Sequence, residues 1–255
     1  RLCLEDGFSM PYLEKLFISG MGCSAEDLTN MFTGLKSLRK LIVEGVHQFG
    51  DDPDVWRALP RSIEILSWRL VYSSDSIECI AALPRLKYLD LHYMGDMEWH
   101  RLLPVAERLE RFNVNMIQHG SGSVEAICKF IQSMVNLKIL EVRLYRGGTW
   151  DELLPVISKL PVLEQLKLSC SLVKSFNLPE AKGLLHLTKG PVRRSLVQCH
   201  ITVEDTEEEQ NSLHRFMKEK VVPLFPKRVK GRWALRNRYP AHAADKTCRD
   251  FDLLH

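Results

Sequence analysis

Three stretches of the chain decide the fold: LPRLKYLDL at 83–91, MVNLKILEV at 134–142 and LPVLEQLKL at 160–168. In each stretch, a block that begins at the fourth residue carries apolar residues at its first, fourth and sixth positions. The residues between the last two are polar, which predicts a short β-strand that buries one face.

The same block recurs along most of the chain. Its apolar residues at positions one, four and six are Leu13, Leu16, Ile18; Leu38, Leu41, Val43; Ile63, Leu66, Trp68; Leu86, Leu89, Leu91; Leu109, Phe112, Val114; Leu137, Leu140, Val142; and Leu163, Leu166, Leu168. Successive blocks start 25, 25, 23, 23, 28 and 26 residues apart. Isolated apolar triplets are common in a chain that is 45% hydrophobic, but a series in register indicates a repeat architecture.

Helical spacing of apolar residues separates the blocks. The predicted helices run over 24–33, 76–83, 123–134 and 149–160, each with a candidate N-cap and acidic residues in or beside its first turn. One strand-and-helix unit cannot bury its apolar face alone, so neighbouring units must stack. The sequence therefore predicts an α/β solenoid with a parallel concave sheet and convex helices.

The three quoted stretches resemble leucine-rich repeats, over about residues 2–171, and the resemblance implies a horseshoe. Unequal repeat lengths and helical convex segments resemble the intracellular repeats of F-box and leucine-rich-repeat substrate receptors, although no F-box segment is visible. The chain departs from the family at block position nine, which usually holds an Asn or Cys that bonds the turn. That position holds Met21, Val46, Val71, Met94, Ile117, Tyr145 and Ser171.

Composition restricts the compartment and the partners. The formal charge of +3 comes from 35 basic and 32 acidic residues, too small a surplus to draw the whole protein to nucleic acid or to an anionic membrane. The cysteines are widely spaced and odd in number, without a CxxC pair, at positions 3, 23, 79, 128, 170, 199 and 248. Reduced thiols of this kind suit the cytoplasm or the nucleus.

The sequence shows no glycosylation sequon, no apolar run near membrane-spanning length and no signal segment at its start. We therefore expect neither secretion nor membrane insertion. The chain opens at Arg1, and Leu2 and Leu4 resemble the inward residues of a strand, so we expect further residues upstream.

Block position two alternates in charge. It holds Glu14, Arg39, Glu64, Lys87, Glu110, Lys138 and Glu164. Equal positions of stacked parallel strands are direct neighbours, so we expect a ladder of exposed ion pairs that serves register and solubility.

Positions three, five and seven should face the concave side. The residues predicted to bind a partner there are Arg69, Tyr88, Asp90, His92, Asn113, Asn115 and Arg143. Arg and Tyr are typical interface hot spots, but solvated strand residues would also be polar, so both interpretations stay open. Phe17, Ile42 and Ile65 are predicted to form an apolar column near the N-terminal end, facing an upstream domain or a ligand.

No pattern predicts an enzyme, a metal site or a cofactor. Asp90 and His92 could be a base and its orienting carboxylate, but residues two apart on a strand are separated by about 7 Å, and no nucleophile is placed beside them. The histidines include no HExxH, and no Cys or His pair has zinc spacing. HGSGS at 119–123 lacks the phosphate-binding GxxxxGK[ST] order and is predicted to be a loop.

The repeat period falters after Leu168, and SLVQCHITV at 195–203 is predicted to be the last strand. We expect a solenoid over 1–203 and a second region over 204–255, with an amphipathic capping helix at 204–222. A basic segment follows, with Lys227, Arg228, Lys230, Arg232, Arg236 and Arg238 around Trp233. It could contact phosphate or an acidic partner, or it could be a solvated tail with Trp233 against the cap.

These patterns favour a recognition module that binds a protein on its concave face; the family resemblance implies the substrate-receptor part of a ubiquitin ligase. One alternative is a scaffold subunit that uses the convex helices and the basic tail. A third is nucleic-acid contact through 227–238.

Overall fold

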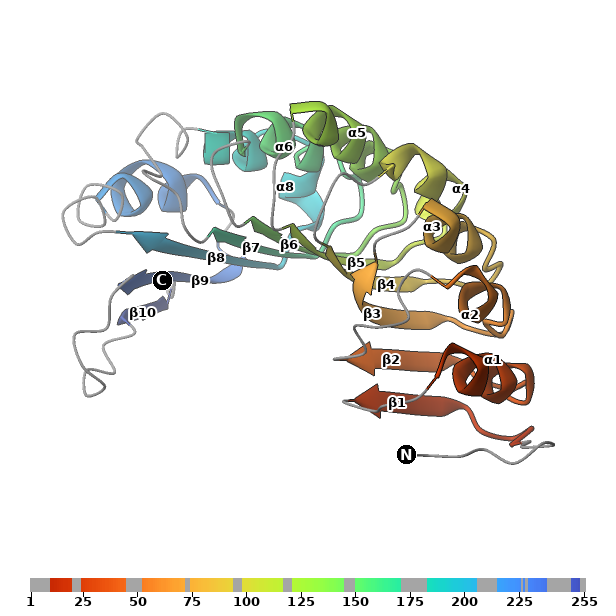
Figure 1. Cartoon of the computed structure of the whole chain (residues 1–255). Helices are drawn as coiled ribbons and strands as arrows, with labels where there is room; N and C mark the ends of the chain where they lie inside the picture. The colour runs from red at the N-terminus through yellow and green to blue at the C-terminus, as the bar shows by residue number, and fades with distance from the viewer. Residues whose placement is uncertain are drawn as a thin grey trace.

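The computed structural model describes residues 10–19, 24–44, 52–71, 74–93, 98–116, 121–144, 150–170, 183–205, 215–225, 227, 229–237 and 249–252. The described strands form one ten-stranded sheet in chain order, curved along one side of the molecule (Figure 1). They are β1 (Lys15–Ser19), β2 (Lys40–Glu44), β3 (Ile65–Val71), β4 (Tyr88–Tyr93), β5 (Arg111–Met116), β6 (Ile139–Leu144), β7 (Gln165–Cys170), β8 (Gln198–Asp205), β9 (Lys230–Asn237) and β10 (Arg249–Asp252).

Strands β1 to β9 pair in parallel, and β10 pairs antiparallel to β9. The register places block position four of each repeat beside position four of the next, as in Leu66 beside Leu89 and Leu89 beside Phe112. These register pairs confirm the repeat alignment read from the sequence.

Helical segments cover the convex side of the sheet (Figure 1). They are α1 (Ala25–Thr33), α2 (Pro53–Arg57), α3 (Ser74–Ala81), η1 (Trp99–Leu102), α4 (Leu103–Ala106), α5 (Ser121–Gln132), α6 (Trp150–Ile157), η2 (Leu184–Thr188), α8 (Val192–Ser195), η3 (Met217–Val221) and η4 (Val222–Leu224). Ser24 caps α1 in a capping box with Asp27, as the Ser-Ala-Glu-Asp start predicts. The predicted loop at 119–123 is wrong in part, because α5 already begins at Ser121.

The core lies between sheet and helices. The block leucines from Leu38 onward are buried, whereas Leu13 and Leu16 of the first block are partly buried. Larger rings fill the core where a repeat offers an aromatic residue. Trp68 packs on Trp56 with ring centroids 4.1 Å apart, while Trp99 stacks on Phe130 at 5.7 Å and meets Phe112 edge-on. Each cluster joins a strand residue to the helices behind it, which ties sheet and helices together.

Backbone hydrogen bonds lock neighbouring repeats at block position two. The carbonyl of Glu110 accepts from the N–H groups of both Lys138 and Ile139, at 2.8 and 3.1 Å, and the carbonyl of Lys87 accepts in the same way from Glu110 and Arg111. This double acceptance holds the entry of each of these strands against the previous one.

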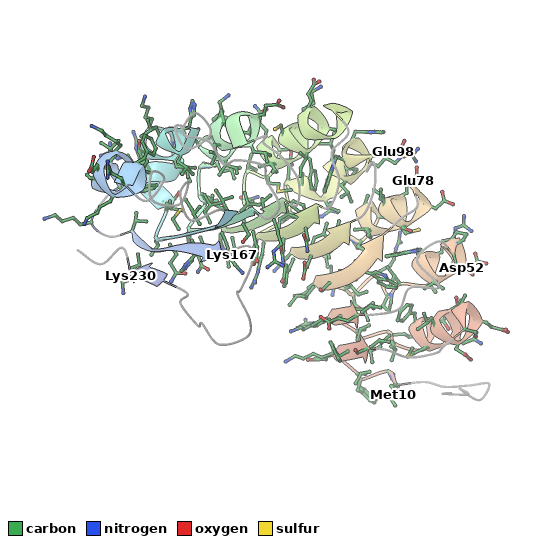
Figure 2. All side chains as sticks on the ribbon, turned by 60° about the vertical axis from the view of Figure 1, so that its left-hand side comes forward. Met10, Asp52, Glu78, Glu98, Lys167 and Lys230 are labelled. Carbon is green, nitrogen blue, oxygen red and sulfur yellow. The ribbon has the colours of Figure 1, made fainter. Side chains whose placement is uncertain are left out.

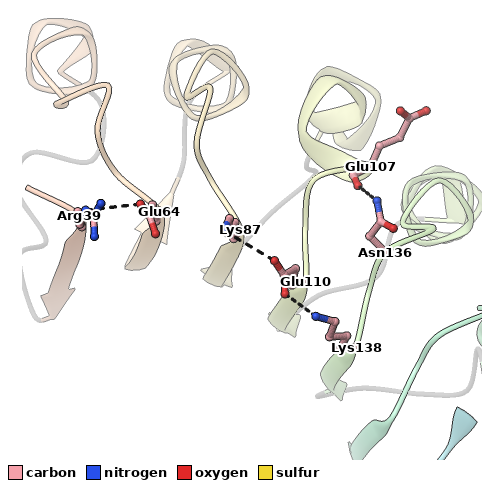
Figure 3. A network of polar contacts seen from close by, with 7 residues as sticks. All are labelled: Arg39, Glu64, Lys87, Glu107, Glu110, Asn136 and Lys138. Carbon is pink, nitrogen blue, oxygen red and sulfur yellow. Dashed lines mark hydrogen bonds and ion pairs between the residues drawn. The ribbon is translucent and has the colours of Figure 1, made fainter.

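Side chains just before position one make a second connection between repeats. Asn136 Nδ2 donates to the Glu107 carbonyl at 2.7 Å (Figure 3), and Ser62 Oγ donates to the Leu38 carbonyl at the same distance. Arg108 reaches the Leu83 carbonyl at 3.1 Å. Position nine of the blocks lacks the asparagine that is usual in leucine-rich repeats, and these bonds instead tie adjacent repeats at the opposite end of the strand.

The sheet continues beyond the predicted last strand. Residues 195–203 do contain a strand, and β8 pairs with β7, but β9 then pairs with β8 along Gln198–Asp205. Much of the segment predicted as a basic tail is therefore a strand of the same sheet. The predicted capping helix is wrong at its start, because Glu204 and Asp205 belong to β8. Residues 206–214 lie outside the described residues, and 215–224 are helical throughout, as predicted up to 222.

Candidate functional site

The concave face consists of the side chains at block positions three, five and seven. Strand alternation turns these positions away from the helices, as the burial of β2 shows: Leu41 and Val43 are buried, whereas Lys40, Ile42 and Glu44 are partly exposed. In register, each position forms a row that crosses the sheet from one repeat to the next. A ligand lying on the sheet would meet several strands at once.

The position-two ladder borders this face, and the described ion pairs confirm it in part. Arg39 lies 3.6 Å from Glu64, and Glu110 is shared between Lys138 at 2.8 Å and Lys87 at 4.0 Å (Figure 3). The hydrogen bond from Lys138 lowers the pKa of Glu110, and the charge of Lys138 acts in the same direction. These charges are compensated by one another, as expected for a ladder that serves register.

A stacked pair occupies the middle of the concave face. The guanidinium carbon of Arg111 lies 4.6 Å from the ring centroid of Tyr88, its register neighbour on β4. Burial raises the pKa of the Tyr88 hydroxyl, Asp90 raises it further, and Arg111 opposes the shift. The stack holds a cation and an aromatic ring in one fixed arrangement.

Acidic groups beside this pair are engaged by their neighbours. Ser67 Oγ donates to Asp90 Oδ2 at 2.8 Å, and Lys167 Nζ lies 2.6 Å from Glu141 Oε1. Ser67 is buried although it lies in a concave row, and so is Asn115. The floor of the face is thus a packed polar surface.

The register brings the predicted partner-binding residues together on β3 to β6. Arg69 pairs with His92, His92 with Asn115, and Asn115 with Arg143, while Asp90 pairs with Asn113. The side chains of Arg69 and His92 lie outside the described residues. The same rows contain three contributors that the prediction left out: Arg111, Glu141 and Lys167. Their columns were visible in the sequence, but the stack and the ion pair were not.

The predicted apolar column is wrong in one member. Phe17 pairs with Ile42, whereas Ile65 pairs with Lys40 and lies in a different row. Phe17 is 58% exposed on the first described strand. The apolar group is therefore a diagonal across two rows.

The basic segment can be placed only in part. Lys227 and Lys230 are exposed, and Arg232 and Arg236 lie on β9, but the side chains of these two arginines lie outside the described residues. Arg228 and Arg238 lie wholly outside them. Their arrangement as a patch stays a prediction.

Metal ligation finds no support in the described ranges, where no three His, Cys, Asp or Glu side chains form a group able to hold an ion. Among the helices that the structure describes, none has the length and apolar character needed to cross a bilayer.

Comparison with known proteins adds little to this geometry. No protein-family model and no curated protein matches the sequence. Among solved structures, a similar chain is the leucine-rich repeat-containing protein LegL7 from Legionella pneumophila, with 16% identity and a TM-score of 0.46, covering 91% of this chain and 87% of that one. The fold rests on the strand register of this chain itself, which is that of an α/β leucine-rich-repeat solenoid.

Proposed function

We propose that this protein is a recognition module that binds another protein on its concave face. The observation that carries the proposal is the Tyr88–Arg111 stack at the centre of that face. Tyr and Arg dominate interface hot spots, and a side chain that is already ordered loses little entropy on binding.

The dimensions of the face favour a macromolecular partner. Strands β3 to β7 are neighbours, and at about 4.8 Å per strand they span roughly 19 Å. A protein interface of standard size buries about 800 Å² per partner, so a protein partner would cover these strands and extend beyond them. The polar floor around Ser67 and Asn115 provides hydrogen-bonding groups for orientation.

The test compares two sets of alanine variants in affinity purification and then against the purified partner. Tyr88→Ala should weaken binding by about 2 kcal/mol or more, since it removes both an aromatic anchor and the support of Arg111. Lys87→Ala is the matched control: it lies on the same strand entry, is 58% exposed and belongs to the compensated ladder, so binding should change little. Equal small losses from both variants would favour the scaffold alternative, in which the convex helices bind.

A narrower form of the proposal is that the module is the substrate-receptor part of a ubiquitin ligase. It is supported only by the resemblance of the repeats to those of F-box and leucine-rich-repeat receptors. In cells, a protein captured by the wild-type chain should be ubiquitinated. The same captured protein should accumulate in cells that carry the Tyr88→Ala variant in place of the wild-type chain. A captured protein whose half-life is unchanged would remove this narrower role and leave the recognition module.

A further inference from the structure

Charge is unequal between the concave face and the N-terminal half of the convex side, whereas the C-terminal half of the convex side is basic, with Lys159, Lys189, Arg193 and Arg194 exposed. The described basic side chains of the concave rows are Lys15, Lys40, Arg111, Arg143, Lys167 and Lys230, and the acidic ones are Glu44, Asp90 and Glu141. Along the convex side, helices α1 to α3 and η1 with their N-terminal residues carry Glu26, Asp27, Asp52, Asp54, Asp75, Glu78 and Glu98 against Arg57 and Arg101. Figure 2 shows Lys167 and Lys230 on the sheet and Asp52, Glu78 and Glu98 on the helical side. A chain of net charge +3 thus presents a positive concave face.

The described acids on this face each have a partner, although Asp90 Oδ1 is buried without a hydrogen bond, whereas two guanidiniums of the face have no acceptor. Asp90 accepts from Ser67, and Glu141 pairs with Lys167. Within the described part of the chain, neither the guanidinium of Arg111 nor that of Arg143 has a hydrogen bond or an ion pair, and Arg111 Nε is buried without an acceptor. Arg111 is nevertheless held in place by the ring of Tyr88. A guanidinium without an acceptor can be satisfied by a carboxylate, which accepts two parallel hydrogen bonds from its accessible N–H groups.

We infer that the partner presents carboxylate side chains to the concave face, one to Arg111 and one to Arg143; this rests on the proposed function. The two arginines lie on β5 and β6, four residues apart along the strand direction, because Arg111 pairs with Ile139. At about 3.3 Å per residue, this separation is roughly 13 Å. An extended segment with two acidic residues four positions apart spans the same length.

The row between the two arginines favours spaced carboxylates over a phosphate backbone. Asp90, Asn113 and Glu141 occupy this row at position five. Every nucleotide of a nucleic-acid strand carries a phosphate, at about 3.4 Å of axis per strand in a duplex, so phosphates between the two arginines would meet Asp90 and Glu141. A partner segment with a neutral polar residue midway between its two acids avoids this repulsion and can hydrogen-bond to Asn113.

The test uses the whole chain and a fluorescein-labelled nine-residue peptide with Glu at its third and seventh positions and Ser or Thr elsewhere. Fluorescence anisotropy should show binding at low salt that weakens as salt rises. Arg111→Ala and Arg143→Ala should each weaken binding about tenfold, and Arg111→Lys should lie between wild type and Arg111→Ala, because it keeps the charge and loses the planar fork. Lys159→Ala, an exposed lysine just after α6, is the matched control and should change nothing. Circular dichroism checks that each variant is folded.

Several outcomes would overturn the inference: no binding at low salt, equal binding of the peptide with Gln in place of both Glu residues, or no effect of the arginine variants. Tighter binding of a single-stranded oligonucleotide or of a phosphoserine version of the peptide would assign the face to phosphate instead. The inference and the proposed function can fail separately. A purified partner that is lost with Tyr88→Ala, but binds independently of Arg111, Arg143 and salt, would remove the acidic partner and keep the recognition face.

Discussion

Leu89→Ala tests the repeat core at its centre. Leu89 lies on β4 at position four of its repeat block and is fully buried. In the register it lies between Leu66 and Phe112. The substitution removes three buried carbons, worth about 2.4 kcal/mol in transfer at about 0.8 kcal/mol each. A cavity term adds to this, because both neighbours belong to strands that are hydrogen-bonded on either side and cannot collapse inward. We therefore expect a loss of about 3 to 5 kcal/mol in the free energy of unfolding.

The measurement is urea unfolding followed by far-UV circular dichroism, with the slope of the transition compared between variants. Lys87→Ala, two residues earlier and exposed, should change stability by no more than about 0.5 kcal/mol. A cooperative repeat array should keep one transition in both proteins. The assigned register is refuted if Leu89→Ala costs less than about 1 kcal/mol with an unchanged slope.

Three further predictions concern single sites. Gly190→Ala would place a Cβ 2.0 Å from the Ser158 carbonyl oxygen, so this variant should unfold at a clearly lower temperature than the wild type. Gly34→Ala is the control and should have little effect, because Gly34 has a φ of −82° that alanine adopts readily. Equal melting temperatures of the two variants would contradict the close approach at Gly190. In an NMR titration, the pKa of Glu110 should lie below that of a free glutamate and should rise toward it in Lys138→Gln. Because the pKa is lowered in the folded state, the pair stabilises the protein at neutral pH, and this contribution is lost as the pH falls through the folded pKa. An unchanged pKa of Glu110 in the variant would exclude the pair. Burial raises the pKa of Cys199 to about 12, so this thiol should resist alkylation at pH 8 until the protein unfolds, and rapid labelling of the native chain would show that β8 is not packed as described.

The fold was predictable because its main signal is local. Positions four and six of each block are apolar, and the helices between blocks start at residues such as Ser24, so one repeat already specifies its own strand and helix. Stacking then follows from the need to bury the remaining apolar face. The register needed no further information, since equal block positions must lie side by side.

Strand β9 escaped prediction because it lacks the apolar residue at position four. In register, Gly231 stands at that position, where the other parallel strands carry Leu, Phe or Cys, and the large apolar residues Trp233 and Leu235 come only afterwards. The basic residues of the segment made it resemble a solvated tail. Strand β9 belongs to the sheet because it pairs in parallel with β8. The two segments are about 30 residues apart, and backbone pairing over this distance leaves no periodic signal in the sequence of β9.

The same reasoning separates what could be predicted of the concave face from what could not. The columns were visible, but which charges compensate each other depends on side-chain reach: Lys167 finds Glu141 in its own row, while Arg111 turns onto Tyr88 and pairs with no acid among the described residues. At position two, strict alternation of sign gives each charge an opposite neighbour, so that column has nothing left to offer a partner. Arg111 and Arg143 lie in rows without such alternation, and an anion from outside can lower their energy. We therefore expect affinity to depend on the rows where the alternation of charge fails.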